Sequence, residues 1–160
     1  MVKKALRTLC VATAVTCCMA FPAMAAETKA EYKEEVTPIK NEIKELESQA
    51  KPLREENKRV AAAYKSIRLN KKENGTLSIS KTNWKKAKEL HKQIASIRAE
   101  YKPAGETGKV IRTQIKEAVK NKDFDTAVNG MKQILEQKKS GLERLKKTNE
   151  IWAQIDELLD

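Results

Sequence analysis

Cysteine is absent from the chain after residue 18. Its three cysteines, Cys10, Cys17 and Cys18, all lie in the first 25 residues. The part of the chain that follows therefore has no disulfide, no thiolate metal site and no cysteine nucleophile. This argues against the small extracellular scaffolds that depend on disulfides, and it fits a bacterial periplasm or cell surface better than an animal secretory protein.

Residues that commonly carry catalysis are scarce as well. His91 is the single histidine, and it has no second histidine or nearby cysteine with which to share a metal ion. We expect it to flank a seam between helices. The sequence contains no glycine-rich phosphate loop, no serine elbow and no carboxylates at a site-like spacing, and the adjacent Asp156 and Glu157 are expected to be solvated. These absences predict a protein that is not an enzyme and has no cofactor or metal.

Aromatic residues make up only 4% of the chain. Those after residue 25 all fall on apolar helical stripes, which predicts core positions rather than stacking platforms for bases. They are Tyr32, Tyr64, Trp84, Tyr101, Phe124 and Trp152. Sequence-specific nucleic acid is therefore not expected as a partner.

The chain begins with the pattern of a targeting segment. Lys3, Lys4 and Arg7 precede an apolar run that ends at Phe21, and Ala23-Met24-Ala25 supplies the small residues of a cleavage site. We predict that residues 1–25 are a cleaved signal peptide and that the protein is exported to the periplasm, the cell surface or the medium. A retained N-terminal anchor is the alternative, although the apolar run is short of the roughly 20 residues that span a bilayer.

A long heptad pattern covers residues 32–69, where apolar residues recur in alternating steps of four and three. Its d positions are Tyr32, Ile39, Leu46, Leu53, Val60 and Ile67, and its a positions are Val36, Ile43, Ala50, Asn57 and Tyr64. Such a pattern predicts one long helix in coiled-coil packing. Pro38 and Pro52 fall on its outer side: Pro38 could lie in the first helical turn, whereas Pro52 should kink the helix, or else break it.

A second helix is expected from Ser80, a suitable N-cap, to Tyr101, after a loop over residues 70–79 that contains Asn74-Gly75. Folding it back against the first helix predicts an antiparallel hairpin over about residues 31–102. The expected contacts are Ile67 with Trp84, Tyr64 with Ala87, Val60 with Leu90, Leu53 with Ile97, and Ala50 with Tyr101. Large residues then face small ones, as layered packing prefers.

Residues 103–108 are expected to form a linker to two further helices, over about 109–121 and 124–160, with Asp123 or Asp125 as a cap between them. The last helix has a wide apolar face, so it should contact more than one neighbour. The predicted fold is all-α, an elongated antiparallel coiled-coil hairpin joined to a small three- or four-helix bundle, in a single domain over residues 26–160. The hairpin beyond Leu53 and Ile97 should extend from the bundle.

Positive charge is concentrated on the predicted hairpin. Residues 51–102 hold fifteen basic and five acidic residues, whereas residues 26–50 carry a balance of −3 and residues 103–160 a balance of +1. We call the following residues the basic tip, within about residues 60–90: Lys65, Arg68, Lys71, Lys72, Lys81, Lys85, Lys86 and Lys88. The tip either keeps the protein soluble or binds an anionic partner such as a membrane, a cell-wall polymer or an acidic protein.

Asn57 and Asn149 interrupt the two longest apolar series at a positions. A polar residue at such a position commonly fixes the register or oligomeric state of a coiled coil. The two side chains could pair with each other, with water, or across an interface between copies. A homo-oligomer that forms through the heptad faces is therefore possible.

In length, basic charge and signal peptide, the chain is similar to the class of small periplasmic helical chaperones, such as the Skp and Spy/CpxP groups. It has neither the Leu-Thr-x-x-Gln motif of the second group nor the strand-rich body of the first, so no residue roles are carried over. The leading expectation is a non-enzymatic envelope binding protein, chaperone-like, that holds unfolded or envelope protein clients. The alternative is a tether or structural protein that docks its basic tip on an anionic partner.

Overall fold

The computed structural model describes residues 28–100 and 102–159, with the backbone alone for residues 102–106. This part of the chain forms four α-helices: α1 (Lys29–Asn74), α2 (Lys81–Ala99), α3 (Lys102–Lys120) and α4 (Phe124–Leu159). The predicted all-α class is confirmed. The predicted signal peptide, 1–25, lies outside the described residues, and so does Tyr101 with its expected contact to Ala50.

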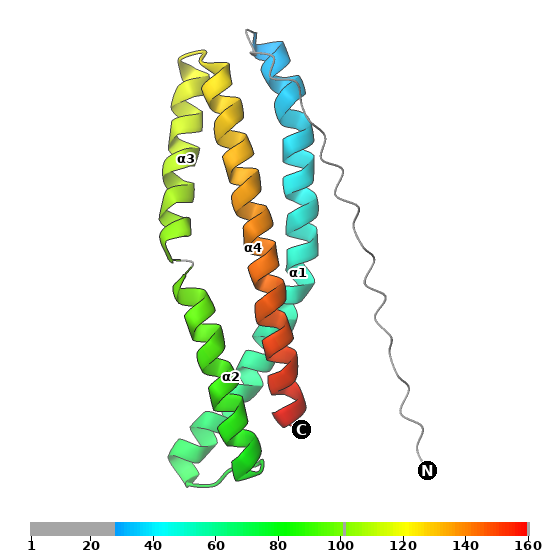
Figure 1. Ribbon diagram of the computed structural model, residues 1–160, viewed down its shortest axis with the longest axis vertical. Coiled ribbons are helices and arrows are strands. Elements are labelled where there is room, and N and C mark those ends of the chain that lie inside the picture. The colour runs from blue at the N-terminus through cyan, green and yellow to red at the C-terminus, as the bar shows by residue number, and fades with distance from the viewer. Residues whose placement is uncertain (1–27, 101, 160) are drawn as a thin grey trace, which may run out of the picture.

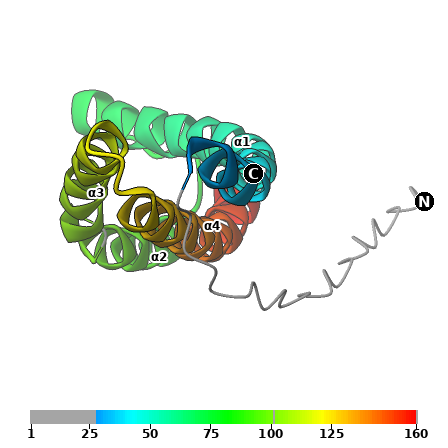
Figure 2. The ribbon, with the colours of Figure 1, turned by 90° about the horizontal axis from the view of Figure 1, so that it is seen from above.

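The helices lie along one long axis (Figure 1). α1 runs down the molecule, α2 and α3 follow one another back up, and α4 runs down again, so that α1 and α4 are parallel. The views from the side and from above (Figure 2) agree that α4 lies between the other helices. α1, α2 and α3 each have α4 as their close backbone neighbour, which makes α4 the central element of the fold.

α1 begins with a capping box. The Thr28 hydroxyl accepts a hydrogen bond from the backbone N–H of Glu31 (3.2 Å), and the Glu31 carboxylate accepts one from the N–H of Thr28 (3.0 Å). This is the Thr-x-x-Glu pattern of helix N-termini, so the helix starts two residues before the predicted boundary. The prediction that Pro38 lies in the first turn is wrong, because the capped start places it in the third turn.

Both prolines lie inside α1, which is continuous through them. Their side chains are exposed, so each proline removes one backbone donor without placing its ring in the core. A break at Pro52, the alternative to a kink, is therefore wrong. Figure 1 shows α1 changing direction in its middle third, the part of the helix that contains Pro52.

The turn between α1 and α2 follows the predicted chemistry. Gly75 ends α1 in the left-handed conformation (φ 69°), and its N–H donates to the carbonyl of Lys71. Ser80 caps α2, since its hydroxyl accepts a hydrogen bond from the N–H of Asn83 (3.0 Å).

The predicted linker at residues 103–108 is helical instead, because α3 already begins at Lys102. Pro103 is compatible with this, since it lies in the first turn, where its missing N–H has no acceptor to lose. At the other end of α3, Lys122 adopts a left-handed conformation (φ 60°), and the Asp123 carboxylate caps α4 by accepting a hydrogen bond from the N–H of Thr126 (3.1 Å).

α1 and α4 pack in one constant parallel register. Tyr32 stacks on Phe124 with ring centroids 5.4 Å apart, Val36 shares a buried cluster with Val128, and Asn149 bonds to Asn57. The members of each pair are 92 positions apart. The two apolar series, each in steps of four and three, therefore match along the seam, as the a and d positions of a parallel coiled coil do.

The apolar series of α4 runs in steps of four and three from Phe124 to Leu159, and Lys138, Asn149 and Asp156 are its polar members. Each of these three residues bonds to a partner on α1. The Lys138 ammonium donates a hydrogen bond to Glu47 (2.6 Å), and the Asn149 amide donates one to the Asn57 side-chain oxygen (2.9 Å). The Asp156 carboxylate accepts hydrogen bonds from both terminal nitrogens of the Arg59 guanidinium group. Lys139 also reaches Glu42 at 2.8 Å, in the g-to-e arrangement of parallel coiled coils. In this register every one of these side chains reaches its partner, and a shift of α4 along α1 by one heptad would separate the partners.

α1 and α2 meet through side chains towards the tip of the hairpin, but they are not close backbone neighbours as the predicted coiled coil requires, because each of them packs on α4 instead. Val60 and Tyr64 of α1 share a buried core with Trp84, Ala87 and Ile94 of α2. This core also contains Trp152 and Ile155 of α4, so α4 reaches further along the hairpin than the sequence predicted. The reason is the wide apolar face of α4, which covers α1 and α2 together.

We predict that Asn57→Val and Asn149→Val each lower the free energy of unfolding by about 1–2 kcal/mol, because each leaves the other amide without its partner. The double variant should lose much less than the sum of the two, since it removes both polar groups. Urea unfolding followed by circular dichroism measures all three. Additive losses would show that the two amides do not stabilise the fold as a pair.

Two glycines inside α4 should respond to alanine in opposite ways. A methyl group at Gly130 would lie 2.5 Å from Cγ1 of Ile115 on α3, whereas one at Gly141 would meet nothing within 4 Å. We expect Gly130→Ala to lower the free energy of unfolding by about 1 kcal/mol or more through overpacking. Gly141→Ala should raise it by about 0.5–1 kcal/mol through helix propensity. Thermal unfolding of the two variants checks the opposite signs.

Candidate functional site

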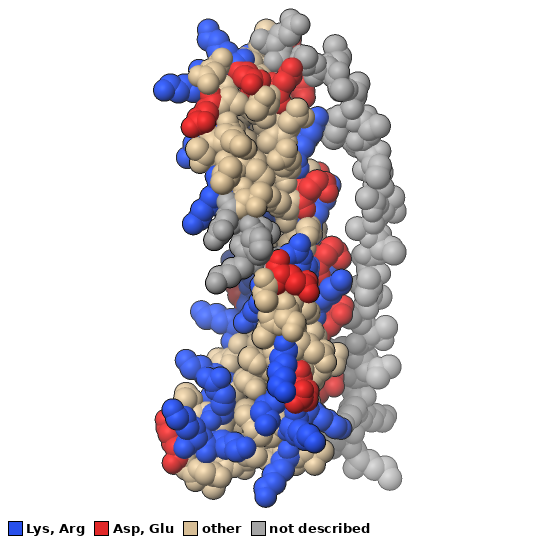
Figure 3. Space-filling model, turned by 60° about the vertical axis from the view of Figure 1, so that its left-hand side comes forward, with Lys and Arg blue, Asp and Glu red and all other residues tan. Residues whose placement is uncertain are grey.

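The eight residues of the basic tip come together at one end of the molecule. Four lie in the C-terminal part of α1 and four in the N-terminal part of α2, which the loop at residues 75–80 joins. All eight are exposed, and Figure 3 shows lysine and arginine side chains gathered over this lower end. The structure therefore presents the predicted tip as one cationic surface.

We call the part of the molecule away from the tip, where α1 runs beside α4, the shaft. Within the described residues, the ion pairs between helices lie along the shaft rather than at the tip. They join Glu42 with Lys139, Glu47 with Lys138, and Arg59 with Asp156. The last pair corrects the expectation that Asp156 is merely solvated. Hydrogen bonding from Lys138 lowers the pKa of Glu47, and hydrogen bonding to Glu42 raises the pKa of Lys139. Charges on the shaft are thus used to join α1 to α4.

The helix dipoles divide the tip into two halves. Lys71 and Lys72 lie in the last turn of α1, where the partial negative charge of the helix end stabilises cations. Lys81 lies in the first turn of α2, which contains no acidic residue, and Lys85 and Lys86 follow one turn later. A cation in the first turn of a helix is unfavourable, so the stability of α2 does not account for Lys81.

An aromatic cluster joins α1, α2 and α4 directly above the tip. Tyr64 stacks on His91 (4.6 Å between centroids) and on Trp84 (5.1 Å), and Trp152 meets both Tyr64 and His91 edge-on. His91 therefore flanks the seam, as expected. Burial lowers the pKa of His91, and the nearby Arg98 and Arg68 lower it further.

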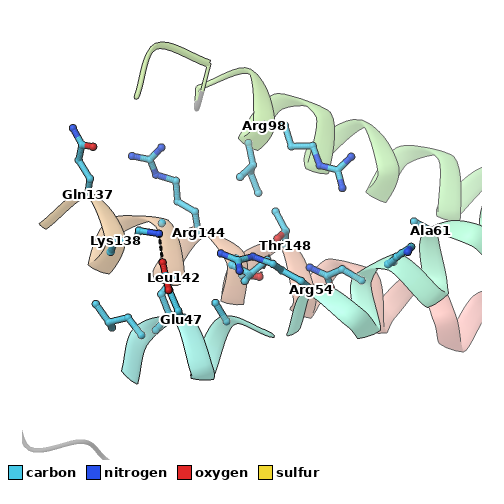
Figure 4. Close-up of a pocket in the computed structure, with 16 residues that line it drawn as sticks. Glu47, Arg54, Ala61, Arg98, Gln137, Lys138, Leu142, Arg144 and Thr148 are labelled. Atoms are coloured by element: carbon cyan, nitrogen blue, oxygen red, sulfur yellow. Dashed lines mark hydrogen bonds and ion pairs between the residues drawn. The ribbon is translucent and has the colours of Figure 1, made fainter. Parts of the chain in front are cut away.

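A cavity of about 580 Å³ opens on the shaft between α1, α2 and α4. Its apolar walls include Ala50, Ile97, Leu142 and Leu145. Figure 4 shows that arginines from three helices surround it: Arg54 from α1, Arg98 from α2 and Arg144 from α4. The sequence predicted direct contact between α1 and α2 near Ile97, whereas the structure has this cavity between the two helices there.

The cavity was not expected from the sequence, because the heptad pattern predicts the second helix directly against the first. Two signals were available. Gly141 lies within a strong helical pattern at a position that packing does not explain, and the facing side of α1 has the small residues Ala50 and Ala61. Small residues on two facing helices leave room between them.

The described residues contain no group of three or more histidine, cysteine or acidic side chains placed to hold a metal ion. None of the helices there combines the length and the apolar character that crossing a membrane requires.

The chain was compared with family models, with curated proteins and with solved structures, and none of the three comparisons gives a match.

We predict that acid destabilises the fold through His91. The unfolded chain takes up a proton on this side chain near its ordinary pKa of 6.5, whereas burial keeps the folded form neutral to a lower pH. Stability should therefore fall as the pH is lowered through about 6.5, and this contribution should level off below the pKa of the folded state.

His91→Gln removes this titration while keeping a side chain of similar length. Unfolding free energies measured at about pH 8 and about pH 5.5 should differ less in the variant than in the unaltered protein. An equal difference in both proteins would assign the pH dependence to other groups.

Proposed function

We propose that the protein is a non-enzymatic, exported helical docking protein, which binds an anionic surface of the cell envelope with its basic tip. The α2 half of the tip carries this proposal: Lys81 lies in the first turn of α2, where it opposes the helix dipole, and Lys85 and Lys86 add exposed charge one turn further on. An anionic partner would reverse that cost, because it would interact favourably with both the lysines and the helix end.

The layout of the charges supports the same conclusion. Among the described residues, three ion pairs join α1 to α4 along the shaft, whereas all eight basic side chains of the tip are exposed together at one end. A solubilising surface has no need for such separation. Phospholipid headgroups are the simplest surface of this chemistry, and cell-wall polymer or an acidic protein would offer the same charge.

The chaperone-like hypothesis is the second candidate, and the structure gives it less support. A holdase needs an accessible apolar surface for its clients. Among the described residues, the large hydrophobic side chains that are exposed are Leu69 (38% exposed) and Val110 (56%), which belong to α1 and α3. Suppression of client aggregation that survives high salt would nevertheless favour this candidate.

We predict that the protein binds vesicles containing anionic phospholipid and not vesicles of zwitterionic lipid alone. Reversing Lys71, Lys72, Lys85 and Lys86 to glutamate should weaken this binding at least about a hundredfold, since each basic residue near an anionic surface contributes about 1 kcal/mol. Binding should also vanish near 1 M salt, where the Debye length falls to about 3 Å. Co-sedimentation with vesicles measures both effects.

The matched control reverses Lys29, Lys33, Lys40 and Lys44 instead, which are also exposed and lie near the opposite end of α1. This variant has the same net charge as the tip variant, so it should keep most of the binding if position matters. Equal loss in the two variants would mean that only net charge acts. Undiminished binding by the tip variant would disprove the docking proposal.

A further inference from the structure

The cavity on the shaft is a second candidate site, separate from the basic tip. Its volume of about 580 Å³ lies within the range of small-molecule binding sites. It opens between three helices, a common location for ligand sites in helical bundles. None of the eight tip residues lines it.

The lining combines apolar walls with an excess of positive charge. Its basic residues are Arg54, Lys58, Arg98, Lys138 and Arg144, and its single acidic residue is Glu47. Glu47 is bonded to Lys138, so the pair is neutral as a unit. The other four cations therefore give the cavity a positive potential, and they come from α1, α2 and α4 (Figure 4).

Gly141 is an independent indication that open space at this position has a function. A glycine inside a helix costs about 1 kcal/mol relative to alanine, so it usually has a packing reason. Gly130 has one, because α3 approaches it closely, but no heavy atom lies within 4 Å of where a Gly141 side chain would begin. Gly141 lines the cavity, and its missing side chain leaves volume in it.

We propose that this cavity binds a single-chain amphiphile with an anionic head, a long-chain carboxylate or phosphate ester. The alkyl chain would lie against Ala50, Leu142 and Leu145, and the head would pair with Arg54 and Arg98 at the exposed edge. A purely apolar ligand would leave the arginines unused, and a bare anion would leave the apolar walls unused. Bidentate pairing suits guanidinium groups with either kind of head.

Calorimetric titration of the purified protein with laurate, with dodecyl phosphate and with dodecanol, each below its critical micelle concentration, tests the proposal. Saturable binding of one molecule per chain is expected for the two anions, and dodecanol should bind at least about tenfold more weakly. The relative affinity of laurate and dodecyl phosphate distinguishes the two kinds of head. Equal affinity for dodecanol, or no saturable binding, would overturn the proposal.

Variants locate the binding. Gly141→Leu and, from the facing helix, Ala61→Leu fill the cavity and should each weaken laurate binding at least about tenfold. The double variant Arg54→Gln, Arg98→Gln should do the same while leaving the affinity for dodecanol unchanged. Thermal unfolding identifies any variant that fails to fold, and because the two filling variants lie on different helices, one remains informative if the other unfolds.

Lys85→Gln with Lys86→Gln is the matched control, since it removes two exposed charges from the tip and none from the cavity. Unchanged laurate binding is expected. Loss of laurate binding in this control, with retention in the filled variants, would assign the ligand to the tip and refute the cavity site. The outcome is independent of vesicle docking, which the tip variants test.

Discussion

The parallel seam between α1 and α4 is the interaction on which the rest of this fold depends. Its apolar positions are matched at a constant offset, and three polar positions of α4 each find a partner on α1. Apolar contacts alone would tolerate a shift by one heptad. The Asn57–Asn149 pair opposes such a shift, because Asn57 is buried and would lose its partner, and the two partly exposed ion pairs add a modest preference for the same register. The seam therefore selects one register, and α2 and α3 pack against the helix that it positions.

Charge serves different purposes along the molecule. On the shaft, carboxylates and ammonium groups pair between helices, each pair contributing modestly because it is partly exposed. At the tip, eight basic side chains are exposed together at the joined ends of α1 and α2, and in the cavity basic side chains surround apolar walls. The same residue type thus has a structural explanation on the shaft, and for the tip and the cavity we propose anionic partners. This contrast is the physical basis of both proposals.

Much of the secondary structure could be predicted from residue patterns. The heptads of α1, the turn at Gly75, the Ser80 cap and the start of α4 at Phe124 all follow local rules. The errors have local causes too. The capping box at Thr28 was overlooked, which misplaced Pro38 within its helix. The expected linker at residues 103–108 is helical, because a proline in the first turn of a helix costs little and α3 can begin at Lys102. The basic tip was found because charge is visible in sequence, whereas the cavity was not.

The sequence by itself determined that the described part of the chain is helical, which faces of the long helices are apolar, and where the positive charge lies. It did so because helical periodicity and charge are properties of neighbouring residues. Only the tertiary structure decided that α1 pairs with the parallel α4 along its length. Every series in steps of four and three is compatible with every other, in either direction, so the pattern alone does not choose a partner. The wide apolar face of α4 and the pairing of Asn149 with Asn57 both favour α1 as the partner, and they act only once residues far apart in the sequence become neighbours in the folded chain.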